Sequence, residues 1–251
     1  MYQTRVIPCL LLRGYGLVKT RKFKDAKYIG DPVNAVRIFS EKEVDELIVL
    51  DIDASREVRE PNYNLIAEIA GECFMPMAYG GGIRTLDQVR RLIRSGVEKV
   101  VINSAAAEST KIITEAADIF GSQAVVASVD VRRTLLSGYK VVAKSATVET
   151  KLKLEEYLNR LQAAGAGEIF INSVDRDGAM AGYDLELLRI VSGAVKVPIV
   201  ACGGAGTVEH LKQAIKEGGA SAVAAGSMFV FHGRHRAVLI NYPDESIRKL
   251  I

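Results

Sequence analysis

Two apolar runs of the chain end where a catalytic carboxylate would be useful, and only one of them ends in a carboxylate. Residues 124–130 form a run that ends in Asp130, and residues 5–11 form a similar run that ends in Leu11. An aspartate at a strand end can donate or accept a proton, whereas a leucine can do neither. If the two halves of the chain are repeats, these places are equivalent, and a site with room for two facing carboxylates holds one.

Two glycine-rich turns predict anion-binding loops. Residues 80–82 are one turn, and Gly203, Gly204 and Gly206 make the other. Glycines let backbone N–H groups approach a phosphate closely, and the amino end of a following helix adds positive dipole. Residues 103–104 and 225–227 would complete the two loops. A single turn of this kind often serves only a tight connection, but two in equivalent places predict an elongated ligand with a phosphate at each end.

Four charged residues stand at or near the starts of expected strands: Arg5, Glu46, Lys99 and Glu168. Residues in such places are usually solvated. Because two are positive and two are negative, they could instead form a neutral ring that closes the lower end of a barrel. Buried charges need partners, so this ring also has a purely structural explanation.

Eight short apolar runs alternate with helix-period segments, which predicts an α/β fold with a parallel sheet. The runs cover residues 5–11, 46–51, 74–79, 98–103, 124–130, 167–173, 197–202 and 222–226. The clearest helices cover residues 31–43, 86–95, 109–120, 151–164, 184–195 and 207–217, the first with Asp31 as its cap and Pro32 at its first position.

Three blocks of sequence recur at a constant offset of 122 residues, since positions 46, 80 and 94 align with 168, 202 and 216. The offset from Leu11 to Asp130 is 119 residues, which implies a small difference in loop length. This repeat predicts a single (β/α)8 TIM barrel over residues 1–251, built from half-barrels of about 1–121 and 122–251. A doubly wound open sheet is the alternative.

The composition narrows the class of protein. A net charge of +3, with both signs interspersed and no tryptophan, suits an anionic small molecule but offers no basic patch for nucleic acid. Neither a signal sequence nor an apolar run of membrane-spanning length is present, so we expect a cytoplasmic protein. The three cysteines, Cys9, Cys73 and Cys202, are expected to be reduced core thiols. The histidines lack metal-ligand spacing, and we expect no metal and no cofactor.

Several motifs together resemble the cyclase subunit of imidazole glycerol phosphate synthase, from about residue 3 to 232. The motifs include Ile7-Pro8-Cys9-Leu10, Gly80-Gly81-Gly82-Ile83-Arg84, Ile102-Asn103-Ser104-Ala105, Asp175-Arg176-Asp177-Gly178 and Gly203-Gly204-Ala205-Gly206. The resemblance implies a (β/α)8 barrel whose amino-terminal face docks a glutaminase. Ammonia from glutamine would pass through the barrel and meet a bisphosphate aminoimidazole precursor at the other face.

The resemblance also implies roles for individual residues. Asp130 matches the second of two catalytic aspartates, and Leu11 replaces the first. Lys19 matches a ligand-sensing lysine on the mobile first loop, and the loop from Lys144 to Thr150 lacks the family's glycine-rich stretch. The implied phosphate contacts are Gly82, Asn103 and Ser104 at one end of the substrate and Asp177, Gly178, Gly204 and Ser227 at the other. The implied ammonia gate is Arg5, Glu46, Lys99 and Glu168.

Three functional hypotheses follow. The segment 9–16 resembles the family branch associated with sugar amidination, so the first is a barrel that receives ammonia and, with a third amidotransferase protein, converts an acetamido sugar to an acetamidino sugar for surface polysaccharide. The second is a working cyclase of histidine biosynthesis. The third is a noncatalytic allosteric partner that binds an anionic ligand and switches on the glutaminase.

Overall fold

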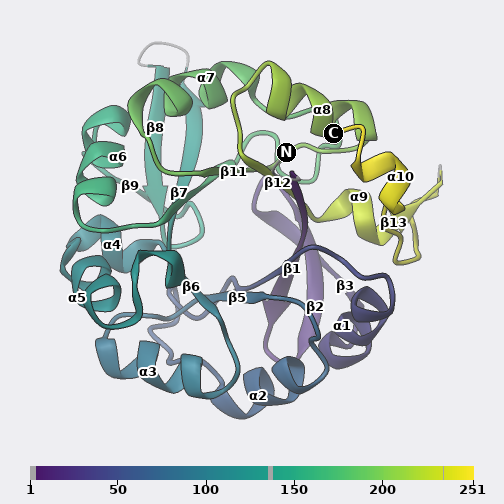
Figure 1. Ribbon diagram of the computed structural model, residues 1–251, viewed down its shortest axis with the longest axis horizontal. Helices are drawn as coiled ribbons and strands as arrows, with labels where there is room; N and C mark the ends of the chain where they lie inside the picture. The colour runs from purple at the N-terminus through teal and green to yellow at the C-terminus, as the bar shows by residue number, and fades with distance from the viewer. Residues whose placement is uncertain (1–3, 135–137, 234) are drawn as a thin grey trace.

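Eight parallel strands close into a barrel, with helices around its outside (Figure 1). The computed structural model describes residues 4–134, 138–233 and 235–251. The barrel strands, each paired with the next and the last with the first, are β1 (Arg5–Arg13), β4 (Leu47–Asp51), β5 (Met77–Gly80), β6 (Lys99–Ile102), β7 (Val125–Thr134), β10 (Glu168–Ser173), β11 (Ile199–Cys202) and β12 (Ala222–Ala225). The structure confirms the predicted TIM barrel and excludes an open sheet.

Two strands begin more than one residue later than the sequence predicted. The runs expected at 74–79 and 197–202 become strands only from Met77 and Ile199, directly after Pro76 and Pro198. A proline has no N–H to donate to a strand ladder, so it limits the start of a central strand. The carbonyl groups of both prolines still accept hydrogen bonds, from the backbone N–H groups of Leu47 and Ile169, each at 2.9 Å.

Seven helices of nine or ten residues surround the barrel within the described part of the chain. They are α1 (Pro32–Glu41), α2 (Tyr63–Gly71), α3 (Leu86–Arg94), α5 (Lys111–Phe120), α6 (Leu154–Ala163), α7 (Leu185–Ala194) and α8 (Val208–Lys216). Asp31 caps α1 by accepting a hydrogen bond from the Asn34 N–H at 2.8 Å, as predicted. None of the described helices is long and apolar enough to cross a membrane.

Shorter elements complete the connections. They are α4 (Ser104–Glu108), the 3-10 turn η1 (Ser122–Ala124), α9 (Ser227–Val230), β13 (Phe231–His232), β14 (Ala237–Val238) and α10 (Glu245–Arg248). The helix expected from residue 109 begins at Lys111 because Ser109, which ends α4, is extended with φ −156°. Helix α2, which the periodicity did not single out, begins at an Asn62 cap.

The core has two layers because both faces of every barrel strand are covered. One layer packs the outer strand faces against the helices. The other fills the barrel itself with apolar side chains, among them Ile7, Ile48, Val126, Phe170 and Val200. Parallel strands buried on both faces are apolar at nearly every position, so they were easy to locate in the sequence as continuous apolar runs.

Two barrel strands extend beyond the rim as hairpins. Strand β1 continues into β2 (Gly16–Arg21) and β3 (Lys24–Gly30), and β7 continues into β8 (Gly138–Ala143) and β9 (Val148–Glu149). The hairpins begin at the first and fifth barrel strands. This recurrence supports the division into half-barrels, which stays a prediction.

The tip of the β2–β3 hairpin is fastened to the loop after β10. The Asp177 carboxylate accepts hydrogen bonds from the Thr20 hydroxyl at 2.7 Å and the Phe23 N–H at 3.2 Å, while its carbonyl accepts the Lys22 N–H at 3.0 Å. Gly178, with φ +63°, lies so close to the Thr20 carbonyl that a Cβ would collide with it. The hairpin therefore depends on a glycine at 178 to dock.

We expect Gly178→Ala to release the hairpin tip. Trypsin should then cleave after Arg21, Lys22 or Lys24 about tenfold faster, since about 1.4 kcal/mol in an opening free energy is a tenfold change in population. Gly14→Ala is the matched control, because Gly14 has φ +60° but nothing within 4 Å of the added Cβ. Equal acceleration in both variants would show that backbone strain, not the collision with Thr20, controls docking.

Candidate functional site

A pocket at the carboxyl ends of the barrel strands gathers the two acid-pair positions, Lys19 and all the phosphate contacts that the family resemblance implies, although Gly206 of the second glycine turn does not line it. Strands β1, β4, β5, β6, β7, β10, β11 and β12 or the loops after them all contribute to its wall. Its lining includes Leu11, Lys19, Gly82, Asn103, Ser104, Asp130, Asp177, Gly178, Gly204 and Ser227. Ten residues spread over most of the chain thus face one space.

Asp130 is the buried acid of this pocket. Its side chain is on β7, and its carboxylate accepts a hydrogen bond from the Asn103 amide at 2.9 Å. The same amide nitrogen donates to the Ser128 hydroxyl at 3.2 Å. Burial raises the pKa of Asp130 to about 7, although the hydrogen bond from Asn103 opposes the shift. A carboxyl group with this pKa can both give and take a proton near neutral pH.

Leu11 lines the same pocket from β1 and supplies no second carboxylate there. Its strand neighbours are Leu50 on β4 and Val18 on β2. Leu50 also lines the pocket. The wall beside β1 is therefore apolar, and Asp130 faces it without a carboxylate at position 11 to share its proton.

Both glycine turns adopt conformations that favour glycine. Gly81 and Gly82 have φ of +122° and +72°, and Gly203 and Gly204 have φ of +89° and +114°. A Cβ on Gly82 would meet the Arg59 carbonyl, and one on Gly204 would meet the Gly182 carbonyl. The turns thus bring backbone against backbone, which is one sufficient reason for glycine. They also line the pocket, where their N–H groups suit an anion.

Lys19 is a buried cation at the wall of the pocket. Its side chain is 5% exposed, and its ammonium donates to the Cys9 carbonyl at 2.6 Å. Burial lowers its pKa, and no carboxylate of the described residues lies within ion-pair distance of it. Asp177 is close enough to act on it only through the electric field. The amine therefore lacks a fixed counter-ion and lies beside Gly226.

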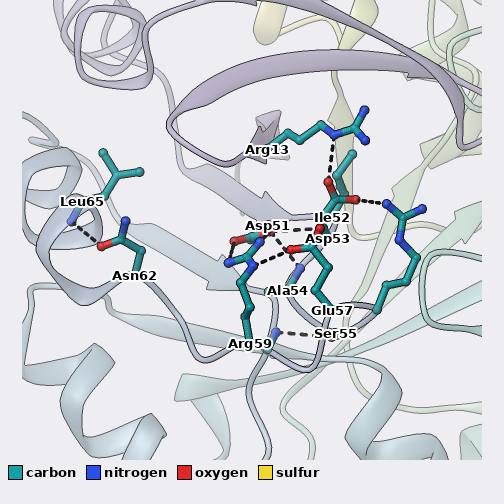
Figure 2. Close-up of polar contacts among 12 residues, drawn as sticks. Arg13, Asp51, Ile52, Asp53, Ala54, Ser55, Glu57, Arg59, Asn62 and Leu65 are labelled. Atoms are coloured by element: carbon teal, nitrogen blue, oxygen red, sulfur yellow. Dashed lines mark hydrogen bonds and ion pairs between the residues drawn. The ribbon is translucent and has the colours of Figure 1, made fainter.

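Asp51 lines the pocket, and Figure 2 shows the polar contacts that it and Asp53 make. The Asp51 carboxylate accepts the N–H groups of Asp53 and Ala54 at 3.1 and 3.0 Å and pairs with Arg59 at 3.3 Å. Asp53 joins the hairpin strand β1 to this loop by pairing with Arg13 at 2.8 Å and Arg56 at 2.7 Å. Their observed contacts are those of residues that order a loop.

The segment from Lys144 to Thr150 forms a strained turn without glycine. Lys144, Ser145 and Ala146 have φ of +52°, +56° and +59° in succession, a conformation that costs a side-chain-bearing residue free energy. The turn is held by the Ser145 hydroxyl, which donates to the Ile52 carbonyl, and by the Lys144 N–H, which donates to the Ser104 hydroxyl at 3.0 Å. Ser145 thereby reaches the pocket wall.

At the opposite end of the barrel, four charges form a closed ring. Arg5 pairs with both Glu46 and Glu168, and Lys99 pairs with Glu46 at 2.9 Å and with Glu168 at 3.2 Å. Glu46 and Glu168 are buried, so each carboxylate has two cationic partners in place of water. Every charge in the ring touches two of opposite sign, which offsets the cost of removing them from solvent.

Comparison with known proteins places the chain in a family. Residues 5–236 match the model of a family described as histidine biosynthesis protein. The chain is 56% identical over 244 residues to a Pseudomonas aeruginosa protein provisionally named imidazole glycerol phosphate synthase subunit hisF2, covering 97% of each chain. It is 44% identical over 232 residues to the imidazole glycerol phosphate synthase subunit HisF of Caulobacter vibrioides, covering 92% of this chain and 89% of that one.

The chain belongs to the HisF-type family of imidazole glycerol phosphate synthase subunits. A provisionally named HisF of Leptospira borgpetersenii, 51% identical over 245 residues and covering 97% of this chain and 96% of that one, is a further relative. The fold and the family therefore both agree with the family resemblance that the sequence motifs indicated.

Sequence reasoning missed several polar groups of this HisF-type pocket. Thr20, Ser55, Ser128 and Ser145 all line it, yet none was named as a site residue, although Ser128 and Ser145 lie within segments that the sequence analysis described. The sequence analysis also did not predict the β2–β3 hairpin, although Gly14 and Gly16 are typical of a turn. Cys9 is buried in the core, as expected, whereas Cys202 is only half-buried, and both also line the pocket. His210 is half-buried, and its side chain accepts a hydrogen bond from the Gly206 N–H at 3.2 Å.

We expect Asp130 to make the folded HisF-type barrel less stable as pH rises. Its pKa is near 3.8 when exposed and about 7 when folded, so folding favours its protonated form, and that advantage is lost between these two values. Asp130→Asn removes the titration. The free energy of urea unfolding should therefore increasingly favour the variant from pH 4 to pH 8. A difference that does not change with pH would show that the folded carboxyl group titrates normally.

Proposed function

We propose that this chain is the synthase subunit of a glutamine amidotransferase that uses ammonia to convert an acetamido sugar to an acetamidino sugar. A glutaminase subunit would dock at the charged ring and release ammonia there. A third amidotransferase protein would activate the acetamido group at the pocket. The relatives' names support the synthase-subunit part of this proposal, and the sugar acceptor rests on the residues of the pocket.

One observation carries the proposal. The ring of four charges is complete, whereas the pocket holds only one of the two carboxylates that an acid–base pair would need. Arg5, Glu46, Lys99 and Glu168 close the amino-terminal end of the barrel with all charges satisfied. Between the ring and the pocket lie apolar side chains such as Ile7 and Val126, which suit a neutral molecule like ammonia better than an ion. The complete charged ring and the apolar interior behind it therefore support a route for ammonia from the amino-terminal end of the barrel.

The pocket argues for an acceptor other than the histidine-pathway precursor. Formation of the imidazole ring by two carboxylates needs a proton donor and a proton acceptor on facing walls of the pocket. Leu11 can serve as neither. Asp130, with its pKa near 7, retains the ability to protonate a leaving group or to hold ammonia. One acid–base group suffices where a separate protein activates the acceptor. The glycine turns and Lys19 would hold the anionic, phosphate-bearing part of that acceptor.

Cyclase activity in histidine biosynthesis is the second candidate, and the relatives' names favour it. In that case Asp130 alone would perform the acid–base work of the pocket. A noncatalytic partner of the glutaminase is the third, because a ligand held by the pocket could activate the glutaminase without further chemistry. The three candidates differ in product, so one set of assays separates them.

We expect the chain, expressed with its glutaminase, to leave a histidine auxotroph that lacks its own cyclase unable to grow without histidine. The reconstituted proteins should convert an acetamido sugar nucleotide to the acetamidino form, as followed by mass spectrometry, and Asp130→Asn should abolish that product while ligand binding persists. Growth of the auxotroph would overturn the proposal in favour of the cyclase, and Leu11→Asp should then improve growth. Product formation that is indifferent to the barrel would contradict both.

Lys99→Met tests the charged ring as an ammonia entry. The variant leaves Glu46 and Glu168 with Arg5 alone, so the ring should lose its closed arrangement. We expect glutamine-dependent product to fall by about tenfold or more, as for changes that misplace a reactant, while product from added ammonium salts stays near the wild-type rate. A parallel loss from both nitrogen sources would assign Lys99 to folding instead of ammonia transfer.

A further inference from the structure

Two thiols share the floor of the pocket. Cys9 is on β1 and Cys202 ends β11, and both belong to the group of side chains that points into the barrel. Both line the pocket with Leu11 and Lys19. All three cysteines are free thiols, and Cys73 lies apart from this pair in the loop before β5. The proposed amidotransferase activity has no use for either pocket thiol.

The two thiols lie in one cluster of side chains and affect each other's ionisation. Interaction between them lowers the pKa of Cys9 and raises that of Cys202. Lys19 also lowers the pKa of Cys9 through its charge, against the effect of burial. A thiolate is the form of cysteine that binds metals and reacts with electrophiles.

The strand spacing argues against a disulfide between them. Strand β12 lies between β1 and β11, and its pairing with both places Cys9 and Cys202 two strands apart. Neighbouring strands lie about 4.8 Å apart, so the two Cα atoms are about 9–10 Å apart, beyond the roughly 4.4–6.8 Å that a disulfide spans. The thiols meet only because both side chains converge on the barrel axis.

A bridging ion suits the same spacing. Metal–thiolate bonds of about 2.3 Å would place two sulfurs about 4.6 Å apart across an ion bound between them. No group of three or more His, Cys, Asp or Glu side chains able to hold a metal occurs among the described residues, so a site here offers two donors. Two thiolates suit soft ions such as Cu(I), whereas Mg²⁺ and Ca²⁺ need oxygen ligands.

Lys19 supplies the charge balance. A monovalent ion bound by two thiolates gives a complex with one net negative charge. The Lys19 ammonium is buried, has no carboxylate partner among the described residues, and bonds to the carbonyl of Cys9 itself. A negative complex beside it would give this amine the counter-ion that it lacks.

We propose that Cys9 and Cys202 form a two-coordinate site for a soft monovalent cation, Cu(I) or its analogue Ag(I), with Lys19 as the neighbouring counter-charge. The site lies inside the pocket, so the bound ion and the anionic ligand of the proposed function would compete for one space. The inference goes beyond that function and stands without it, because binding of the ion needs no acceptor and no glutaminase.

The test is anaerobic titration of the purified full-length protein with Cu(I) against a chromophoric Cu(I) chelator. We expect one ion per chain for the wild type. Cys9→Ser and Cys202→Ser should each weaken binding by about 100-fold, and Lys19→Met by about tenfold, in the range seen when a group beside the ligands is lost. Thermal unfolding of each variant checks that the barrel is intact.

Cys73→Ser is the matched control. Cys73 is half-buried, and its Sγ lies 3.1 Å from the Met75 sulfur, so it is the competing soft site. The control should bind Cu(I) like the wild type. Three results would overturn the proposal: failure of the wild type to compete with the chelator, loss of binding in Cys73→Ser, or unchanged binding in folded Cys9→Ser. None of these results bears on sugar amidination, which is measured separately.

Discussion

Closure of the barrel between β1 and β12 is the constraint on which the rest of this structure depends. Strand β1 pairs with β4 on one side and with β12, more than 200 residues later, on the other. Because all eight strands are parallel, closure gathers their carboxyl ends at one rim and their amino ends at the other. It sets Leu11 and Asp130 in one pocket and joins Arg5 to Glu46 and Glu168 in one ring.

Buried charges have different surroundings at the two ends of the barrel. The ring balances each charge against two of opposite sign within hydrogen-bond distance. The pocket leaves Lys19 without a carboxylate partner and shifts Asp130 towards its neutral form by burial. A fully paired cluster gains little from a ligand, whereas an unpaired cation and a protonatable acid can both improve their interactions when one binds. The electrostatics therefore favour chemistry at the carboxyl end.

Features that depend on local sequence were predictable, and those that depend on distant contacts were not. The apolar runs located all eight barrel strands because these strands are buried on both faces, and the repeat gave the closed topology. The proline positions explain the late starts of β5 and β11. The sequence contains no pattern that predicts the hydrogen bond between Asp177 and Thr20. It also contains none that predicts left-handed φ angles at Lys144 to Ala146 without glycine. Tertiary contacts impose both features. The position of Asp130 at a strand end identified it as a candidate acid. The shift of its pKa could be predicted only once its burial and its contact with Asn103 were known.

The fastening of the β2–β3 hairpin has a consequence for the rates at which ligands exchange. Lys19, Thr20 and Phe23 of this hairpin form part of the pocket wall, and Asp177 and Gly178 hold that wall in place. A ligand enclosed behind it cannot leave by that side until the Thr20 and Phe23 bonds to Asp177 break. Residence time on this barrel would then be governed by the opening of a hairpin, while affinity is governed by the pocket behind it.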